Sequence, residues 1–252
     1  MNIAIVTGAS SGMGRDFVSA VDQEYNLDEI WVIARREDRL KALEGTVKAK
    51  IRPLVLDLSL NSSIDTIGAL LEKERPSVKI LVNAAGYGVF GAFTDNTLEE
   101  TTGIIDLNDK SLVAVTYTVL PYMKENSAII NLGSNSSWQP VPYMAVYGAS
   151  KAFVLSFSRA LSMELRNRSI KVLAVCPGWI KTEFFDRAVH DDTIKYYDRF
   201  YESKDVVARA MKDLKKGKLA SILGLPVRMQ VRLVKFLPVK LIMNIWCKQQ
   251  GK

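Results

Sequence analysis

The sequence predicts an α/β domain built around one doubly wound, seven-stranded parallel sheet flanked by helices. Three observations predict it. Short Val- and Ile-rich runs recur along the chain, helical periodicity separates them, and a glycine-rich turn follows the first run. The runs do not alternate apolar with polar residues, which is typical of strands covered on both faces. Strands that alternate with helices in this way pair in parallel through right-handed crossovers.

The expected strands are distributed along most of the chain. Six are clear and the seventh is weaker; in order they span Asn2–Thr7, Ile30–Ala34, Ile51–Asp57, Lys79–Asn83, Ser127–Leu132, Ile170–Val175 and Leu219–Leu223. We expect a single domain over residues 1–252, because 252 residues that are 48% hydrophobic can bury one sizeable core. Pro226 and Pro238 divide the last segment, residues 225–252, into shorter pieces.

The charge of the chain is unevenly distributed. The net charge is +7, yet Asp213 is the last acidic residue and nine cations follow it. The part up to Asp213 therefore holds 25 cations against 27 acids, a net charge of −2. The basic character belongs to the C-terminal tail, so a domain-wide nucleic-acid surface is not expected.

Composition also predicts the compartment. Two cysteines, Cys176 and Cys247, are too few for a disulfide scaffold in a chain of this length, which favours a reducing environment. The first residues form a short apolar run that reaches a glycine turn at once, so no export signal is expected. No apolar stretch approaches the roughly 18 residues that a membrane-spanning helix needs. These features predict a cytoplasmic protein.

The glycine-rich turn Thr7–Gly14 follows the first expected strand and opens a helix. Glycines allow a sharp turn and the close approach of a pyrophosphate, and the helix N-terminus presents free N–H groups to that anion. The spacing differs from G-x-G-x-x-G, so that motif does not formally match. Strand, turn and helix together predict a dinucleotide site, with a purely structural turn as the alternative.

The end of the second strand indicates which dinucleotide binds. NAD-binding sites usually place a carboxylate here for the ribose 2′-hydroxyl, whereas cations bind a 2′-phosphate. Ala34 stands where the carboxylate is expected, and Arg35 and Arg36 follow. A guanidinium binds phosphate through two parallel hydrogen bonds. We therefore predict NADP(H) as the cofactor; the alternative is that both arginines only begin a solvated helix.

A serine, a tyrosine and a lysine form the candidate catalytic group. Tyr147 and Lys151 are four residues apart in a helical segment, so they share one helix face. A nearby ammonium is expected to lower the pKa of the phenol from its usual value of about 10. Ser134 lies just past an expected strand, where the ligand crevice of a parallel sheet forms. We expect Ser134 to hold a substrate oxygen while Tyr147 exchanges a proton with it; the alternative is an ordinary exposed helix pair.

Several segments, taken in order, resemble the short-chain dehydrogenase/reductase family, and the resemblance covers residues 2–224. The segments that carry it are Thr7–Gly14, Leu56–Leu58, Asn83–Gly86, Asn108, Ser134, Tyr147–Lys151 and Pro177–Thr182. The family has one Rossmann domain with strand order 3-2-1-4-5-6-7, and it moves a hydride between nicotinamide and a carbonyl or alcohol. The resemblance implies an NADP(H)-dependent oxidoreductase with the catalytic residues Asn108, Ser134, Tyr147 and Lys151. In that family the asparagine carries a water-linked proton relay to the lysine.

The resemblance also implies the cofactor contacts. Asp57 resembles the family's adenine-contacting aspartate, a helix N-cap being its alternative role. Lys151 is expected to hold the nicotinamide ribose, and Ile180 and Thr182 its carboxamide. The full set of expected cofactor-binding residues is Gly8, Ser10, Ser11, Gly12, Met13, Gly14, Arg35, Arg36, Asp57, Leu58, Asn83, Ala84, Ala85, Gly86, Tyr147, Lys151, Pro177, Gly178, Ile180 and Thr182.

The sequence departs from the family pattern at positions that leave every catalytic group in place. Asp109 and Lys110 follow Asn108 where an apolar or small residue is common, and Gly133 stands where a serine is common. Ser11 occupies a position where some NADP-using relatives have a cation. Arg35 therefore carries most of the cofactor prediction, with Ser10 as a second contributor.

Two segments are expected to shape the substrate site. Residues 183–203 fall where the family has a substrate lid, and they carry the aromatic residues Phe184, Phe185, Tyr196, Tyr197, Phe200 and Tyr201. Such a lid favours an apolar or lipid-like carbonyl or alcohol substrate; the alternative is that the rings only pack the lid. The basic amphipathic tail, residues 225–252, is expected to pack across a subunit interface, cover the pocket, or contact an anionic membrane surface weakly.

The remaining expectations concern partners and rival functions. The resemblance implies a homodimer or homotetramer formed through helices including those after Leu98 and Tyr147. No metal site is expected, because the single histidine, His190, lies in a polar run typical of a solvated loop.

One rival function is a non-catalytic NADP(H)-binding sensor on the same fold. A second is a sugar-nucleotide epimerase or dehydratase, which the turn spacing and the short region after Thr182 disfavour. A third is a membrane-surface interaction protein that acts through the tail.

Overall fold

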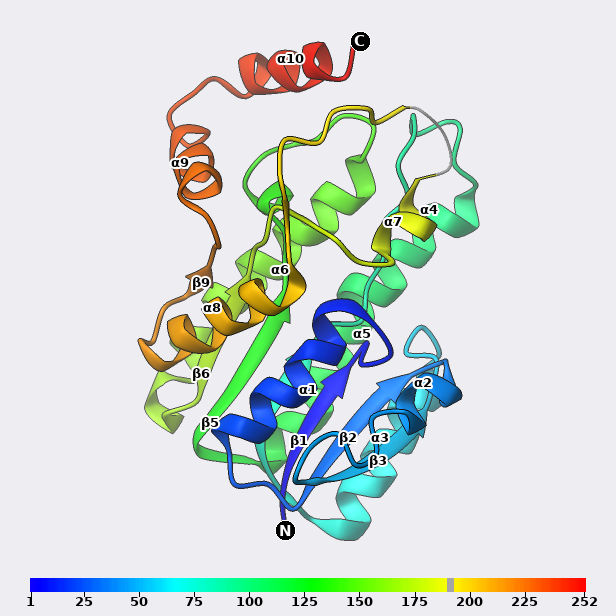
Figure 1. Ribbon diagram of the computed structural model, residues 1–252, viewed down its shortest axis with the longest axis vertical. Helices are drawn as coiled ribbons and strands as arrows, with labels where there is room; N and C mark the ends of the chain where they lie inside the picture. Colours follow the sequence, from blue (N-terminus) through cyan, green and yellow to red (C-terminus); the bar gives the residue numbers. More distant parts are fainter. Residues whose placement is uncertain (190–192) are drawn as a thin grey trace.

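A parallel sheet of seven strands forms the centre of the molecule (Figure 1). The computed structural model describes residues 1–189 and 193–252. The strand order β3-β2-β1-β4-β5-β6-β9 confirms the predicted doubly wound α/β class and order. The strands are β1 (Asn2–Thr7), β2 (Glu29–Ala34), β3 (Lys50–Val55), β4 (Ser77–Asn83), β5 (Met123–Leu132), β6 (Lys171–Val175) and β9 (Ala220–Ser221).

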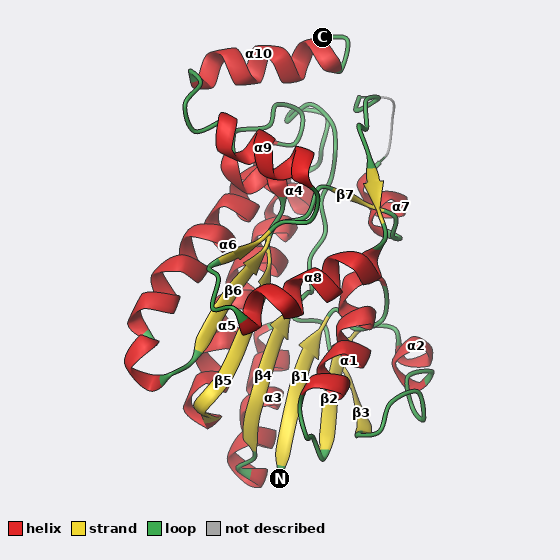
Figure 2. Ribbon diagram, turned by 60° about the vertical axis from the view of Figure 1, so that its left-hand side comes forward, coloured by secondary structure: helices red, strands yellow, loops and turns green. Residues whose placement is uncertain are grey.

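Helices cover both faces of the sheet (Figure 2). In β1, Ala4 and Val6 face one layer while Ile3 and Ile5 face the other, and all four are fully buried. Burial on both faces explains why the strands are continuous apolar runs. The first layer contains α1 (Gly12–Glu24), α2 (Glu37–Lys41) and α8 (Ser203–Lys215). The second contains α3 (Asn61–Glu74), α5 (Ser111–Val119) and α6 (Ala145–Glu164).

Most observed strands begin or end one to four residues away from the predicted bounds. β3 ends at Val55, two residues earlier than expected, although the Leu56 N–H still bonds the Ala34 carbonyl oxygen at 3.1 Å. β5 begins four residues earlier than expected, and Asn126, with φ of +63°, lies where its pairing with β4 is irregular. A small parallel sheet of β7 (Trp179–Ile180) and β8 (Phe200–Tyr201) was not predicted, because two-residue strands show no periodicity.

Short helices and helical turns connect the main elements at both ends of the strands. Helix α4 (Leu98–Ile105) begins with a capping box in which Thr97 and Glu100 satisfy each other's backbone N–H groups. One π-helical turn, Asp106–Lys110, joins α4 to α5. Helix α7 (Phe184–Ala188) lies in the expected lid. Short 3₁₀ turns occur at Leu120–Tyr122, Asn135–Trp138 and Arg166–Arg168.

The tail forms two helices, α9 (Leu225–Leu233) and α10 (Val239–Gln249), beyond the carboxyl ends of the strands and far from the N-terminus (Figure 1). Pro226 lies in the first turn of α9, and Pro238 is the N-cap of α10. Both prolines therefore open helices rather than interrupt them. No helix in the described part of the chain is long and apolar enough to cross a lipid bilayer. The prediction for His190 and its two acidic neighbours falls outside the described residues.

Candidate active site

The glycine turn after β1 has a backbone that only glycine allows. Gly8 and Gly12 have φ of +66° and +51°, in the left-handed region that side chains disfavour. A Cβ on Gly8 would lie 2.7 Å from the backbone of Ala84, and one on Gly14 would collide with the Gly8 carbonyl oxygen. The N-cap of α1, Ser11, makes no side-chain capping bond. The first N–H groups of α1 are thus available to an anion.

The glycine turn forms one wall of a cavity of about 560 Å³. The other walls come from the ends of β2, β3 and β4 and from the start of the lid. Thr7 joins the start of the glycine turn to the segment after β4. Its hydroxyl accepts hydrogen bonds from the backbone N–H groups of Ala84 and Ala85 at 3.0 and 3.1 Å. The expected cofactor residues that line this cavity are Gly8, Ser10, Ser11, Gly12, Met13, Gly14, Arg35, Arg36, Asp57, Leu58, Ala84, Ala85, Gly86 and Thr182.

The two arginines after β2 are engaged differently. Arg35 lies 3.7 Å from the Asp57 carboxylate. Arg36 donates to the Ser10 hydroxyl at 3.1 Å and to Glu183 of the lid at 2.7 Å. Arg39, which also lines the cavity, forms a second ion pair with Glu183. No local sequence pattern indicates this contact, since Glu183 lies 147 residues from Arg36.

Asp57 does not cap a helix, so that alternative is wrong. Its Oδ1 accepts bonds from the Ser59 N–H and hydroxyl at 3.0 and 2.7 Å, while α3 begins only at Asn61 with Leu60 as its N-cap. Burial acts to raise the pKa of Asp57, but the Ser59 bonds and the Arg35 charge outweigh it and hold the pKa below its ordinary value. Asp57 is therefore a charged group at the cavity wall.

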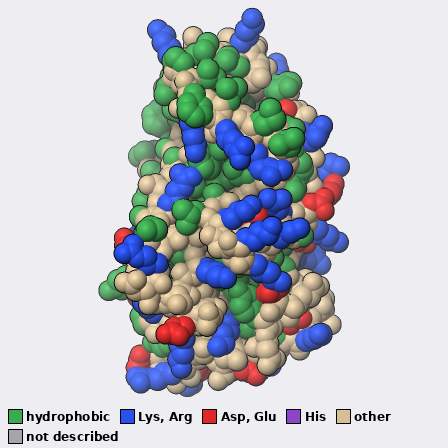
Figure 3. Space-filling model, turned by 90° about the vertical axis from the view of Figure 1, so that its left-hand side faces the viewer, with side chains coloured by type: hydrophobic (Ala, Val, Ile, Leu, Met, Phe, Trp, Pro, Cys, Tyr) green, Lys and Arg blue, Asp and Glu red, His purple; other side chains and the backbone are tan. Residues whose placement is uncertain are grey.

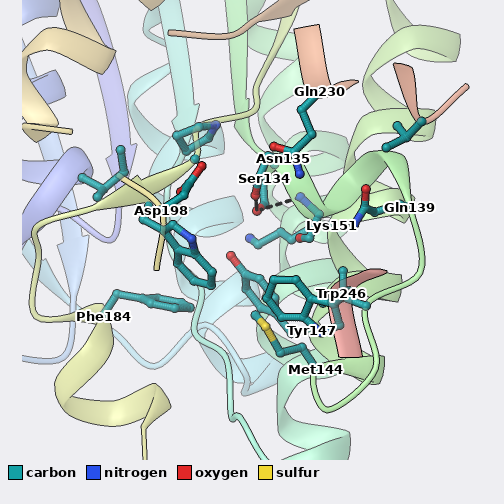
Figure 4. A pocket seen from close by; sticks show the side chains of 18 of the residues that line it. Ser134, Asn135, Gln139, Met144, Tyr147, Lys151, Phe184, Asp198, Gln230 and Trp246 are labelled. Atoms are coloured by element: carbon teal, nitrogen blue, oxygen red, sulfur yellow. Dashed lines mark hydrogen bonds between the residues drawn. The ribbon is translucent and has the colours of Figure 1, made fainter. Parts of the chain in front are cut away.

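Ser134, Tyr147 and Lys151 lie together in a second cavity, of about 360 Å³ (Figure 4). Ser134 follows β5, while Tyr147 and Lys151 project from the first two turns of α6. The Lys151 Nζ donates to the Leu132 carbonyl oxygen at 2.9 Å and lies 5.7 Å from the centre of the Tyr147 ring. The structure thus brings the three residues to one place, as the spacing predicts.

The pKa values of Tyr147 and Lys151 differ from those that the sequence spacing predicts. Burial raises the pKa of Tyr147 to about 12, and the opposing hydrogen bond with Ser134 does not offset it. Desolvation lowers the pKa of Lys151 to about 8, although the Asp109 charge opposes this. The expectation that Lys151 lowers the pKa of Tyr147 is wrong for the free protein, because burial dominates both groups.

Asn108 lies on the π-helical turn, 1% exposed, and lines neither cavity. Its Nδ2 donates to the Tyr87 carbonyl oxygen at 2.9 Å and to the Ser150 hydroxyl at 3.1 Å, and its Oδ1 accepts the Tyr87 N–H. A Cβ on Gly86 would lie 2.8 Å from the Asn108 Oδ1 and 3.4 Å from the Lys151 Nζ. A side chain at position 86 would therefore crowd the Asn108 amide, and glycine leaves this space open.

Asp109, the departure noted in the sequence, has a buried Oδ1 without a hydrogen-bond partner. Desolvation raises the pKa of Asp109 to about 6, and the Lys151 charge acts in the opposite direction. Above that pH the carboxylate is charged and interacts with the lysine. Asp109 therefore interacts electrostatically with Lys151 of the candidate catalytic group, a role that the sequence did not predict.

Asn83, an expected cofactor residue, lines neither cavity. Its Nδ2 donates to Thr116 at 3.0 Å and to Asn131 at 2.9 Å, so it joins β4 to α5 and β5. The remaining expected cofactor residues, Pro177, Gly178 and Ile180, line the second cavity with Tyr147 and Lys151. The two cavities share Met13, Ala84, Gly86, Thr182 and Phe184 as lining residues and are therefore adjacent.

The far end of the second cavity is mostly apolar and aromatic, although the polar residues Gln139, Asp198, Gln230 and Gln249 also line the cavity. Phe184, Phe185 and Tyr196 of the lid line it together with Trp179. The rings of Phe184, Phe185 and Trp179 also pack against Phe90, which the sequence did not predict. The tail closes this end with residues of both helices, and the Trp246 Nε1 donates to the Pro142 carbonyl oxygen at 2.9 Å. Of the expected uses of the tail, covering the pocket is the one that the structure shows.

The chain belongs to the short-chain dehydrogenase/reductase family of oxidoreductases. The family model described as short chain dehydrogenase matches residues 2–193. Sulfoacetaldehyde reductase 2 of Chromohalobacter salexigens is 36% identical over 192 residues, which cover 73% of this chain and 74% of that one. The NADP-dependent 3-hydroxy acid dehydrogenase of Salmonella typhi is 30% identical over 245 residues, 94% of this chain and 95% of that one.

A solved structure shows the same fold. The short-chain dehydrogenase from Sphingobium yanoikuyae in complex with NADPH has a TM-score of 0.81 and 28% identity, covering 94% of this chain and 93% of that one. Solved neighbours described with NAD or NADH also match, such as the enzyme from Burkholderia phymatum at 20% identity and a TM-score of 0.79, which shows the fold alone. The comparisons therefore establish the family and leave cofactor preference to the residues of this chain.

Proposed function

We propose that this protein is an NADP(H)-dependent oxidoreductase that interconverts a carbonyl and an alcohol. The observation that carries the proposal is the convergence of Ser134, Tyr147 and Lys151 in a cavity adjacent to the glycine-turn cavity. A dinucleotide along that path would have its phosphates at the N-terminus of α1 and its reactive end beside Tyr147. When bound, it supplies or accepts the hydride.

The residues present fit such a cofactor. The cradle at Gly8 and Gly12 would be filled by any side chain, and the α1 N–H groups have no side-chain cap. Arg35 and Arg36 would bind the 2′-phosphate of NADP(H), because no carboxylate stands at Ala34 to bind a free 2′-hydroxyl. The Salmonella relative is named NADP-dependent, and the Sphingobium neighbour was solved with NADPH, which supports the same preference.

The side chains would act on the substrate oxygen. Ser134 holds that oxygen, and Tyr147 donates its phenolic proton to it as hydride reaches the carbonyl carbon, which gives the alcohol. Tyr147, whose pKa burial raises to about 12, is protonated at neutral pH and can therefore act as the proton donor in the reducing direction. Lys151 contributes its charge beside the phenol, and Asn108 carries the relay that the family resemblance implies.

The proposal extends to substrate, assembly and compartment. The aromatic far end of the second cavity supports an apolar or lipid-like substrate, with residues 183–203 as its lid. The exposed apolar side chains of α5 and α6 support a homo-oligomer built through these helices. The free thiols of Cys176 and Cys247 support a cytoplasmic, reducing location.

Tyr147→Phe separates the enzyme from a non-catalytic sensor. We expect the variant to bind NADPH as tightly as the wild type, by fluorescence titration, and to lose carbonyl reduction by about 100-fold or more. Unchanged turnover would overturn the role of Tyr147. A parallel titration tests the cofactor, since tighter binding of NADH than of NADPH would contradict the NADP(H) assignment.

A further inference from the structure

The outer surface of α9 and α10 carries large apolar side chains that the described chain leaves uncovered. We call this surface the tail face and define it by Met229, Leu233, Phe236, Val239, Leu241 and Ile245. Their exposed fractions are 60, 56, 84, 52, 45 and 45%, in that order. Figure 3 shows hydrophobic side chains gathered at this end of the molecule, with Lys and Arg side chains among and below them. An exposed apolar surface of this kind marks an interaction site.

The charge on the tail is of one sign. Residues 225–252 contain six cations, Arg228, Arg232, Lys235, Lys240, Lys248 and Lys252, and no acid. Within residues 1–189 and 193–252, none of the six lies within ion-pairing distance of a carboxylate. Lys235 and Lys252 lie over the rings of Trp138 and Tyr143, at 4.6 and 5.5 Å from the ring centres. The tail therefore keeps a positive charge that no carboxylate of the described residues neutralises, and this charge can meet an anionic surface.

The tail face is continuous with the substrate cavity. Leu233 and Ile245 belong to the face and also line that cavity. The opposite side of the tail is fixed to the body, because Ile242 is buried and the Trp246 indole donates to Pro142. The inner side of the tail is thus held against the body and lines the substrate cavity, while its outer side is apolar and cationic.

We propose that the tail face docks on a lipid bilayer with anionic headgroups, so that the substrate cavity lies against the membrane surface. The apolar side chains would enter the headgroup region while the cations contact lipid phosphates, as in interfacial amphipathic helices. A second copy does not fit this face, because pairing it with itself would oppose two cationic surfaces without a single acid.

If the tail face docks on a bilayer, the substrate would come from that bilayer. This inference rests on the proposed function. A membrane-dissolved carbonyl compound would reach the cavity past Leu233 and Ile245 without crossing water. The substrate class that fits this route is an apolar carbonyl or alcohol that partitions into bilayers.

Vesicle co-sedimentation tests the docking without cofactor or substrate. We expect the purified protein to sediment with vesicles of phosphatidylcholine and phosphatidylglycerol at low salt, far less with pure phosphatidylcholine, and to be released by high salt. Phe236→Ser should weaken binding about tenfold, and Lys240→Glu at least fivefold. Phe93→Ser and Lys73→Glu, at exposed positions outside the tail, should bind as the wild type does.

The outcomes separate docking from catalysis. Tyr147→Phe should bind vesicles normally, whereas Phe236→Ser should keep full activity on a water-soluble carbonyl. Absence of co-sedimentation at low salt would overturn docking whatever the enzyme does. Equal losses in the Phe93 and Phe236 variants would also overturn it, as would a wild-type oligomer that dissociates in Phe236→Ser, because the face would then belong to a second copy.

Discussion

At the residue scale, Glu183 pairs with Arg36 and Arg39, two cations that line the cavity proposed for NADP(H). The hydrogen bonds from Arg39 and Arg36 hold the pKa of Glu183 below its ordinary value, so the lid carboxylate is charged at neutral pH. A 2′-phosphate at Arg36 would have to replace this carboxylate or share its cations. Glu183 therefore competes with the phosphate of NADPH but not with the hydroxyl of NADH.

Glu183→Gln should tighten NADPH binding by about threefold to fivefold, since exposed ion pairs contribute at most about 1 kcal/mol. NADH binding should change little, and fluorescence titration of both nucleotides measures the difference. Glu37→Gln is the matched control, because Glu37 is an exposed carboxylate nearby that pairs with Lys41 and not with Arg36 or Arg39. Equal changes for NADPH and NADH would show that Glu183 acts on the lid alone.

The lowered pKa of Lys151 predicts how the activity depends on pH. Its pKa of about 8 means that the ammonium is present below that pH and is lost as the pH rises through it. If the charge supports Tyr147, kcat/KM for NADPH should decline above a pH of about 8, because this constant reports groups of the free enzyme.

Asp109→Asn should move that decline to lower pH. The Asp109 carboxylate, ionised above a pKa of about 6, raises the pKa of Lys151, so its removal destabilises the ammonium. Asp106→Asn changes a carboxylate of the same π-helical turn that pairs with Lys110, and it should leave the pH profile in place. A profile that does not move in Asp109→Asn would contradict the coupling between Asp109 and Lys151.

At the element scale, one side chain of the tail holds the lid. Gln250, 2% exposed, accepts the backbone N–H groups of Lys195 and Tyr196 through Oε1, both at 2.9 Å. Its Nε2 donates to the Tyr196 carbonyl oxygen at 3.4 Å. This part of the lid has no regular structure, so the end of α10 supplies hydrogen bonds that a helix or strand would otherwise provide.

Gln250→Ala should loosen the lid, because it leaves two backbone N–H groups without their acceptor at a cost of about 1–3 kcal/mol. We expect KM for the carbonyl substrate to rise severalfold, with a smaller change in kcat and in NADPH binding. Steady-state kinetics and thermal unfolding of the variant measure these effects. Lys248→Ala, at an exposed position of the same helix, is the control. A fall in kcat alone would contradict a positioning role.

The sequence predicted the elements whose patterns involve residues close together in the chain. The buried strands show continuous apolar runs, and the glycine turn and the Tyr147–Lys151 spacing depend on near neighbours. The strand order followed from the family resemblance. The Glu183 ion pairs and the Gln250 hydrogen bonds join residues far apart in the chain, and only the folded structure brings them together. The burial that raises the pKa of Tyr147 also depends on packing, so spacing alone predicted the wrong direction.

At the scale of the whole molecule, two exposed apolar surfaces differ in charge and position. The tail face lies at one end and is cationic. The second surface runs along α5 and α6, where Tyr117, Phe153 and Met163 are 81, 42 and 54% exposed and Phe153 stacks on Phe157. Because this second surface lacks the one-sided charge of the tail, it is the better candidate for contact with an identical subunit.

The wild-type protein should therefore sediment at a multiple of its 28.1 kDa chain mass. Tyr117→Glu should shift it toward 28.1 kDa, because a twofold contact would bury two new carboxylates opposite each other. Phe236→Glu should leave the mass unchanged, since that residue lies on the tail face. Sedimentation velocity distinguishes these outcomes. A wild-type chain that sediments as a monomer would contradict the oligomer, and dissociation by Phe236→Glu would assign the contact to the tail instead.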